Sequence, residues 1–374
     1  MIGCFPSPRY CVSDPEKSGK LPKERCEQEM STIAVVGSGM MGSALAVPLC
    51  ENGHLVRLVG TPLDADIIEH GRKTGEHLTL KRKMPEHVEW YTIDQVEEAM
   101  EGADLYVNGV SSFGLNWFIE EMIPRIPEKL PVLSVTKGML NYPDGSLKSY
   151  PEIFEESTEK KISFNAIGGP CTSYELADKD FTEVTFCGRD IKMLRWIRSL
   201  FETEYYNISV STDVRGVECA VAMKNAYALG VSLAIGMSIK REGREFEHYN
   251  SQAALFGQSV AEMIHLLELC GGDASNVRLL SGDLYVTVFG GRTRKIGTLL
   301  GTGMSFEEAM KVLEGVTLES IIISTRTAQA VRALITQGRV EEKDFPLLLH
   351  VDELINQGKE LNIPWKAFET EFVR

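Results

Sequence analysis

The chain has 374 residues, enough for two domains of ordinary size, and its 43% of apolar and 25% of charged residues are typical of a globular protein with a sizeable core. The formal net charge of −14 disfavours nucleic acid as a partner, because an acidic surface repels phosphate backbones, although a local basic pocket could still hold one small anion. No run of about 18 apolar residues lacks a charge, so we expect no membrane span.

The cysteines and the first thirty residues bear on the compartment. The eight cysteines form no CxxC pair and no His/Cys cluster at zinc spacing, so we expect reduced thiols in a cytoplasmic protein and no metal site. Residues 1–30 are rich in Pro, Lys, Glu and Ser and lack the apolar core of a signal peptide. We expect a disordered extension there and leave it out of the fold.

The ordered part opens with a βαβ unit. An apolar run at 33–36 ends at glycine, as a buried parallel strand does, and a helical pattern over 40–51 closes at Asn52-Gly53. The next strand covers 54–60. Five further strand-like segments follow, with an amphipathic helix over 192–202 before the last of them: 103–110, 130–138, 161–170, 182–188 and 205–212.

The sequence pattern changes after about residue 212, where strand-like alternation nearly vanishes and helical periodicity replaces it. We therefore predict an α/β fold with two domains. A Rossmann-type, doubly wound dinucleotide-binding domain covers 31–212, and an all-helical substrate and catalytic domain covers 213–374.

A glycine-rich turn joins the first strand to the first helix. Gly37, Gly39 and Gly42 form G-x-G-x-x-G. The first glycine permits the tight turn, the second lets backbone N–H groups approach a pyrophosphate, and the third lets the helix pack against the strand. The helix N-terminus adds partial positive charge, so the turn predicts dinucleotide binding.

The tip of the second strand does not decide between NAD and NADP. It carries Gly60-Thr61 with Asp64 beyond it, whereas Arg57 lies inside the strand. An acid at the tip would favour NAD and an arginine NADP, and neither is in place. We keep both cofactors, with a slight preference for NAD.

The stretch ECAVAMKNAYALGVSLAIG begins at Glu218 and holds a single charge in its middle, Lys224, among small and apolar residues. Lys224 shares a helix face with apolar residues at three- and four-residue steps. Its stem could simply reach to solvent. Alternatively, burial lowers its pKa toward neutrality and fits it for general acid–base catalysis, with Asn225 orienting a substrate or cofactor amide.

Two other stretches offer polar groups. Lys137 follows the carboxyl end of a strand, where ligands bind in open α/β sheets, or it is an ordinary turn lysine; the GGPC turn at 168–171 has the same two interpretations. Asp283 and Thr287 are four apart and would share a helix face. Arg292 follows a Gly-Gly pair, which indicates either an anion-binding loop or a solvated basic loop.

Together these motifs resemble the cytosolic-type, NAD(P)-dependent sn-glycerol-3-phosphate dehydrogenases over residues 32–370. The order of the motifs is the family's, and several short motifs in order are more specific than any one. They are the glycine turn, Thr136-Lys137-Gly138, Gly169-Pro170 with Glu175, Lys224-Asn225, NSQAAL at 250–255, Gly282-Asp283-Leu284, Thr287, Gly291-Arg292 and Glu319.

The resemblance implies a site and a reaction, the interconversion of glycerol 3-phosphate and dihydroxyacetone phosphate by hydride exchange with NAD(P). The catalytic residues that it implies are Lys224, Lys137, Asp283 and Thr287. The substrate-binding residues are Asn225, Arg292, Thr293 and Gln252. The cofactor-binding residues are Gly37, Ser38, Gly39, Met40, Met41, Gly42, Thr61, Lys137, Arg292 and Glu319.

The implied roles divide the chemistry. Lys224 would move the proton of the substrate C2 hydroxyl, and Lys137 would polarise the same oxygen. Asp283 and Thr287 would order the lysines and the substrate, while Arg292 would bind its phosphate. No metal is required.

The chain departs from the family where the phosphate is held. Gln252 stands where the family has Lys or Arg, and Thr293 where it has Asn. Two alternatives therefore stay open: the same chemistry on another small anionic secondary alcohol (a phosphate, sulfonate or carboxylate), or a non-catalytic NAD(P)-sensing protein. The helical half is also compatible with a homodimer.

Overall fold

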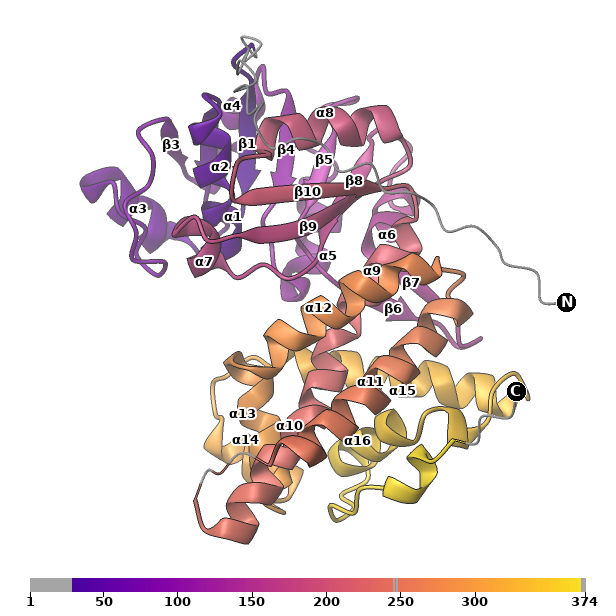
Figure 1. The fold of residues 1–374 in the computed structure, drawn as a ribbon. Helices are drawn as coiled ribbons and strands as arrows, with labels where there is room; N and C mark the ends of the chain where they lie inside the picture. The colour runs from indigo at the N-terminus through magenta and orange to yellow at the C-terminus, as the bar shows by residue number, and fades with distance from the viewer. Residues whose placement is uncertain (1–28, 245, 247, 371–374) are drawn as a thin grey trace, which may run out of the picture. The chain divides into compact units, whose positions relative to one another are not determined.

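The computed structural model describes residues 29–244, 246 and 248–370. The chain divides into two compact units, 1–30 and 31–374. The predicted extension lies outside the described residues except for its last two, so the rest of the fold concerns the second unit (Figure 1).

An eight-stranded sheet forms the first half of this unit, with the strand order β10-β9-β8-β5-β4-β1-β2-β3. All neighbouring strands are parallel except β8 and β9, which are antiparallel. The chain reverses the direction of sheet growth between β1 and β4, so the doubly wound prediction is confirmed. The strands are β1 (Thr32–Val36), β2 (Leu55–Val59), β3 (Val88–Tyr91), β4 (Leu105–Asn108), β5 (Val132–Ser134), β8 (Phe164–Gly168), β9 (Thr182–Cys187) and β10 (Tyr206–Ser211).

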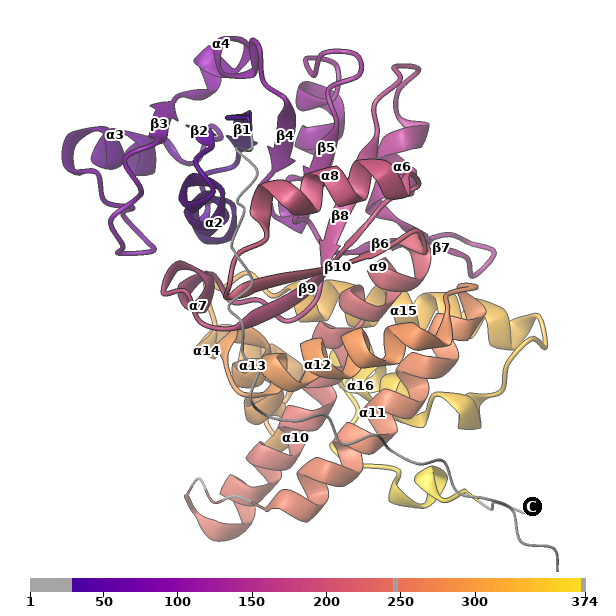
Figure 2. The ribbon, with the colours of Figure 1, turned by 45° about the horizontal axis from the view of Figure 1, so that its top comes forward.

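Helices cover both faces of the sheet (Figure 2). Along β1, Ile33 and Val35 enter one apolar core and Ala34 and Val36 enter the other, because successive side chains point to opposite faces. The first core is closed by α1 (Met40–Ala44), α2 (Ala46–Glu51) and α8 (Ile191–Phe201). The second is closed by α4 (Val96–Met100), the turn α5 (Leu115–Trp117) with its π-helical continuation η3 (Phe118–Met122), and α6 (Tyr150–Glu156). The remaining helices of this half are α3 (Ala65–Thr74) and α7 (Ser173–Ala177).

Two expectations about local structure need correction. The helix expected over 40–51 divides at Leu45 into α1 and α2, because Pro48 has no N–H to bond the carbonyl of Ala44. The expected strands did not include β3 or the hairpin of β6 (Met139–Asn141) and β7 (Leu147–Ser149), which are only four and three residues long. Such short runs carry little periodic signal.

The second half is helical, and no strand follows Ser211 among the described residues. Its central element is α10, which contacts α11, α12, α13, α15 and α16. The helices are α9 (Val214–Ala222), α10 (Lys224–Glu242), α11 (Tyr249–Leu269), α12 (Val277–Val288), α13 (Gly291–Gly301), α14 (Phe306–Val312), α15 (Glu319–Thr336) and α16 (Pro346–Asn356).

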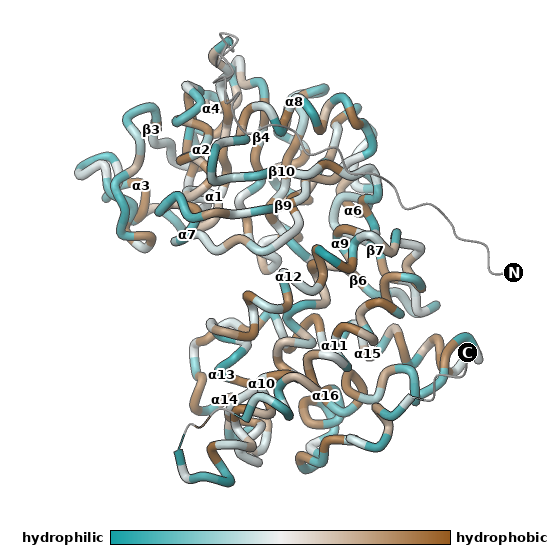
Figure 3. The backbone as a smooth tube through the Cα atoms, in the orientation of Figure 1, coloured by the Kyte–Doolittle hydropathy of each residue, from teal (hydrophilic) through white to brown (hydrophobic). Residues whose placement is uncertain are grey.

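The segment Val214–Glu242 is long and apolar enough to cross a membrane by length and composition. However, 89% of its apolar window is buried inside the fold, as in the core helix of a globular domain. Figure 3 shows hydrophobic residues on β4 and α9 and hydrophilic ones along α3.

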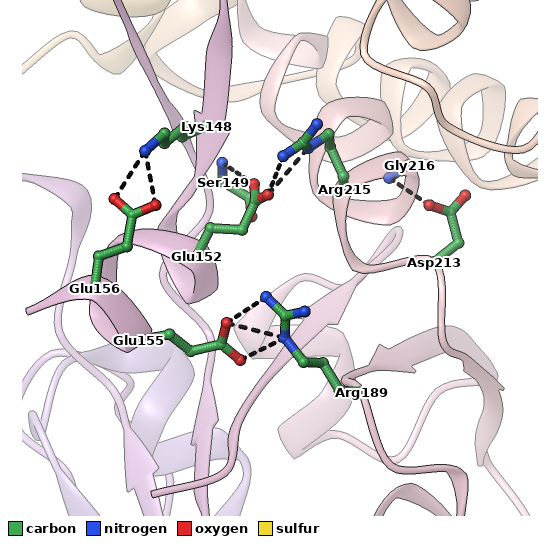
Figure 4. Close-up of polar contacts among 9 residues, drawn as sticks. All are labelled: Lys148, Ser149, Glu152, Glu155, Glu156, Arg189, Asp213, Arg215 and Gly216. Atoms are coloured by element: carbon green, nitrogen blue, oxygen red, sulfur yellow. Dashed lines mark hydrogen bonds and ion pairs between the residues drawn. The ribbon is translucent and has the colours of Figure 1, made fainter. Parts of the chain in front are cut away.

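Polar contacts attach α9 to the sheet half (Figure 4). The carboxylate of Asp213 accepts the N–H of Gly216 at 2.9 Å and caps the helix. Arg215 in its first turn donates from Nε to Glu152 of α6 at 3.0 Å, and Glu152 also accepts the N–H of Ser149 at 2.9 Å. Two further ion pairs in this region are Lys148–Glu156 at 2.7 Å and Arg189–Glu155 at 2.5 Å. The Asp213 cap and the Arg215–Glu152 contact hold the start of α9, the helix that directly precedes Lys224 and α10.

Candidate active site

The glycine-rich turn lines a cavity of about 480 Å³ at the carboxyl ends of β1, β2 and β4. Gly37 has φ +105°, and a Cβ there would lie 2.6 Å from the carbonyl carbon of Gly109. A Cβ on Gly42 would lie 2.3 Å from the oxygen of Gly37, whereas one on Gly39 would meet nothing within 4 Å. The first and third glycines therefore pack against backbone, and the second leaves open space beside the start of α1, as a bound pyrophosphate requires.

The other predicted residues of the glycine-rich turn, Ser38, Met40 and Met41, have different surroundings. Ser38 is fully buried, and its carbonyl oxygen contacts Nε2 of His77 at 2.8 Å. Met40 and Met41 form the first turn of α1, where Met40 is exposed and Met41 packs against the apolar core. His77 therefore fixes the backbone of the turn through the Ser38 carbonyl, and sequence reasoning did not identify this histidine.

The carboxylate of Asp64, which follows the tip of β2 in the sequence, bonds back to the tip residue Thr61. Asp64 Oδ2 accepts the backbone N–H of Thr61 at 2.9 Å and its hydroxyl at 2.7 Å, and both residues line the cavity. Arg57 is occupied elsewhere, since its guanidinium donates to the carbonyl of Glu101 at 2.6 Å beyond the end of α4. Among the described residues that line this cavity there is no Lys or Arg.

Two lysines share one buried carboxylate next to this cleft. Lys224 donates to Oδ1 of Asp283, and Lys137 donates to Oδ2 of Asp283 at 3.3 Å and to the carbonyl of Gly169 at 2.9 Å. The Asp283 side chain is 1% exposed, against 15% for Lys224 and 23% for Lys137. Lys137 follows β5, Lys224 begins α10 and Asp283 lies on α12, so the fold brings them together from three elements.

The two lysines differ in pKa. Burial lowers the pKa of Lys224 to about 8, against the opposing charge of Asp283. Burial also acts to lower the pKa of Lys137, but Asp283 and other negative neighbours outweigh it, so the pKa of Lys137 is raised. Lys224 is therefore the group that can exchange a proton near neutral pH, while Lys137 remains a cation.

A second cavity of about 210 Å³ lies beside Lys137. Lys137, Asn225 and Glu319 line it together with Ser112 and Arg326. Glu319 begins α15, and its Oε1 accepts the hydroxyl of Ser112 at 2.7 Å. Gly138 sits on the ring of Tyr150, where a Cβ would be 2.4 Å from the nearest ring carbon, so the Lys137 loop requires glycine at this position.

The remaining predicted residues lie around the lysines. Thr287 is one turn after Asp283, and its hydroxyl donates to the carbonyl of Asp283 at 2.7 Å. Thr293 is buried in the first turn of α13, with its hydroxyl 3.5 Å from Oδ1 of Asn225. Arg292, one position earlier, is exposed.

Comparison of the sequence and the fold with known proteins identifies the family of the chain. The sequence profile of the NAD-dependent glycerol-3-phosphate dehydrogenase N-terminus matches residues 32–194, and that of the C-terminus matches 213–365. The chain belongs to the NAD-dependent glycerol-3-phosphate dehydrogenase family. It is 33% identical over 285 residues to an NADP(+)-dependent glycerol-3-phosphate dehydrogenase of Archaeoglobus fulgidus, covering 75% of this chain and 83% of that one.

Other relatives of the glycerol-3-phosphate dehydrogenase family extend the match. A glycerol-3-phosphate dehydrogenase [NAD(P)+] of Koribacter versatilis is 28% identical over 337 residues, covering 88% of this chain and 94% of the relative. The solved enzyme of Coxiella burnetii shares the fold with a TM-score of 0.73 at 23% identity, over 91% of this chain and 98% of that chain. A solved glycerol-3-phosphate dehydrogenase of Plasmodium falciparum also shares the fold. Its TM-score is 0.77 at 18% sequence identity, and the match covers 92% of this chain and 97% of that chain.

Gln252 is not part of the cluster that this family member assembles. It lies in the first turn of α11, and its neighbours Asn250 and Ser251 line a separate cavity with Lys240. Lys240 is sixteen residues beyond Lys224 on α10, which corresponds to about 24 Å along the helix axis. The structure therefore places Gln252 apart from the two lysines, because α11 begins at the far end of α10, and its predicted role in binding the substrate phosphate stays a prediction.

Sequence reasoning missed further groups at the site of this glycerol-3-phosphate dehydrogenase homologue. Arg326, Tyr150 and Ser112 come from segments without a motif, and only the fold brings them to Lys137. Glu218 is fully buried with neither carboxylate oxygen hydrogen-bonded to a described side chain. Its charge in the apolar run before Lys224 was a signal that could have marked it.

Proposed function

We propose that this protein interconverts sn-glycerol 3-phosphate and dihydroxyacetone phosphate, with Lys224 as the acid–base and NAD or NADP as the redox partner. The observation that carries the proposal is the pair of lysines that share one buried carboxylate, Asp283. They lie beside two cavities at the carboxyl edge of the sheet, one of which is lined by the glycine-rich turn. The family membership supports the same reaction.

The cofactor site fits a dinucleotide. The open space at Gly39 admits a pyrophosphate, and the cavity continues to Thr61 and Asp64 for the adenosine half. A bound nicotinamide supplies or accepts the hydride of the reaction. Residues that would hold the rest of the dinucleotide are Lys137, Arg292 and Glu319.

The lysines supply the other half of the chemistry. A ketone that gains hydride develops negative charge on oxygen, and the cation of Lys137 stabilises that charge. Lys224 gives the oxygen its proton, and in the reverse direction its neutral amine accepts the proton of the C2 hydroxyl. Asp283 keeps the pKa of Lys224 from falling further, so that both protonation states are populated near pH 8.

Asn225, Thr293 and Arg292 surround the substrate position in this proposal. Asn225 lines the cavity beside Lys137, and Thr293 contacts Asn225 rather than the lysines. Thr287 acts by position: its hydroxyl is bonded to the backbone of Asp283, which orders the turn that presents the carboxylate.

We infer a preference for NAD over NADP from the β2 tip. Asp64 is a carboxylate that can accept a ribose hydroxyl, and it would repel a 2′-phosphate at the same place. Its fixed position against Thr61 supports this selectivity. The nearest strand cation, Arg57, is committed to backbone carbonyls.

A cytoplasmic location and a homodimer remain predictions. The five cysteines among the described residues, Cys50, Cys171, Cys187, Cys219 and Cys270, are all free thiols, which is consistent with a reducing compartment. The oligomeric state is measurable by sedimentation or light scattering of the purified chain.

Turnover of reduced cofactor with a panel of small anionic ketones tests the function. The proposal expects a strong preference for dihydroxyacetone phosphate over its sulfonate analogue. The reverse preference would indicate a related substrate, and cofactor binding without oxidation by any ketone would indicate a sensor.

A further inference from the structure

Arg326 places a second cation on the wall of the Lys137 cavity. It lies on α15 two turns after Glu319, and both residues line the cavity of about 210 Å³. No carboxylate among the described residues lies within ion-pair distance of Arg326. By contrast, Arg332 on the same helix pairs with Asp352 at 3.0 Å. A guanidinium left without an anion at a cavity wall has donors available for a ligand.

Tyr150 lies between the Lys137 loop and the part of the cavity wall that Arg326 forms. Tyr150 and Arg326 line the same cavity, and burial raises the pKa of the Tyr150 hydroxyl while the positive charge of Arg326 acts in the opposite direction. The ring of Tyr150 is 2% exposed and lies directly under Gly138, the residue after Lys137. Arg326 and the Lys137 loop therefore both lie beside the Tyr150 ring at one cavity.

The charges of the cavity are arranged for an anion. Lys137 and Arg326 supply two cations, and the one carboxylate among its described lining residues, Glu319, accepts a hydrogen bond from Ser112. Arg292 is exposed on α13 and is not among the residues that line this cavity. A planar guanidinium can bind two oxygens of a phosphoryl group at once.

We propose that Arg326 binds the phosphoryl group of the substrate and determines the preference for phosphorylated over neutral substrates. This inference rests on the proposed dehydrogenase function and adds a residue to its binding site. It assigns anion recognition to helix α15 of the helical half, in addition to the Arg292 loop that the family resemblance implies.

Kinetics of Arg326→Gln and Arg326→Lys test the proposal, with dihydroxyacetone phosphate and neutral dihydroxyacetone compared at saturating NADH. We expect Arg326→Gln to lower kcat/KM for the phosphate by about ten- to a hundred-fold, mainly through KM, and to change it for dihydroxyacetone by less than about threefold. Arg326→Lys should show an intermediate preference for the phosphate over neutral dihydroxyacetone, because lysine keeps the positive charge but lacks the two parallel N–H donors of the guanidinium. The Kd for NADH should not change.

Two comparators sharpen the test. Lys311→Gln removes one positive charge from α14 at a residue that does not line the cavity and whose side chain is 73% exposed, and it should leave the kinetics of both substrates unaffected. Arg292→Gln measures the contribution of the other arginine in the same assay. Unfolding temperatures of all variants show whether a loss is structural.

The proposal is overturned if Arg326→Gln leaves the preference for the phosphate within threefold of wild type, if it slows both substrates equally, or if it weakens NADH instead. Absence of turnover by the wild-type chain would contradict the proposed dehydrogenase function, and a calorimetric titration with inorganic phosphate would then decide on Arg326 alone. Weaker binding of inorganic phosphate by Arg326→Gln than by Lys311→Gln would support anion binding by Arg326, and equal binding by the two variants would reject it.

Discussion

Nζ of Lys137 and Oδ2 of Asp283 lie 3.3 Å apart, although 146 residues separate them in the sequence. The same carboxylate accepts a hydrogen bond from Lys224, so one buried anion holds the sheet half and the helical half at the point where chemistry would occur. Asp283 thereby sets both the position and the charge state of the two amines.

Replacing Asp283 by Asn should move the pH profile of turnover. The charge of Asp283 raises the pKa of Lys224 against burial, so its removal lowers that pKa below about 8. The inflection of kcat/KM for ketone reduction should move to lower pH, and activity at pH 7.5 should fall by about a hundred-fold or more. An inflection that stays in place while activity falls would show that Asp283 acts on geometry alone.

Replacing Asp64 by Asn should relax the choice of cofactor. The substitution removes the negative charge that opposes a 2′-phosphate but keeps an acceptor for Thr61. We expect the ratio of Kd values for NADPH and NADH to fall by about tenfold, a change of about 1.4 kcal/mol. Fluorescence titration of both cofactors measures it. A wild-type chain that already prefers NADPH would refute the inference from the β2 tip.

Glu218 should make stability depend on pH. Burial raises the pKa of Glu218 from 4.5 to about 8, so the folded chain keeps a proton that the unfolded chain releases above about pH 4.5. The free energy of unfolding should therefore decline as pH rises from about 4.5 to 8, by at most about 5 kcal/mol from this group.

Glu218→Gln removes that titration while keeping nearly the same shape. Its advantage over wild type in free energy of unfolding should grow between pH 5 and 8, as measured by urea unfolding at several pH values. A pH-independent difference between the two proteins would show that the pKa of Glu218 is not raised in the folded state relative to the unfolded chain.

Gly138→Ala should disrupt the Lys137 loop. The new Cβ would lie 2.4 Å from the ring of Tyr150, a fully packed neighbour that cannot move aside cheaply. We expect a loss of about 1–3 kcal/mol in stability and a fall in activity. Gly257→Ala on α11 is the matched control: its Cβ would meet nothing within 4 Å, and it should stabilise the helix by about 0.5–1 kcal/mol. Equal stability of the two variants would contradict the packing account.

Local patterns were enough to predict the glycine-rich turn between β1 and α1. Gly37 and Gly42 pack against backbone as their spacing indicates and Gly39 faces open space, because a strand, a turn and a helix close in sequence depend mainly on local interactions. Lys224 could be identified because a lone charge in an apolar helix must meet a partner. Its helix is interrupted at Met223, so Lys224 begins α10 instead of lying mid-helix.

Long-range geometry was not accessible in the same way. Nothing local to Arg326 or Tyr150 shows that α15 and α6 meet beside Lys137. The antiparallel pairing of β8 with β9 likewise depends on the path of the chain around α7. Gln252 shows the opposite case, in which a motif implied a site residue and the fold places it at the far end of α10.

The pH dependence of turnover in both directions, for wild type and Lys224→Ala, tests the central claim most directly. The account predicts that wild-type ketone reduction falls as pH rises through about 8, where Lys224 loses its proton, and that alcohol oxidation rises through the same pH. Lys224→Ala should lose both inflections and at least 99% of the activity while its Kd for NADH stays within about threefold. A variant that keeps more than a tenth of the activity with the inflection in place would contradict the assignment of Lys224 as the acid–base.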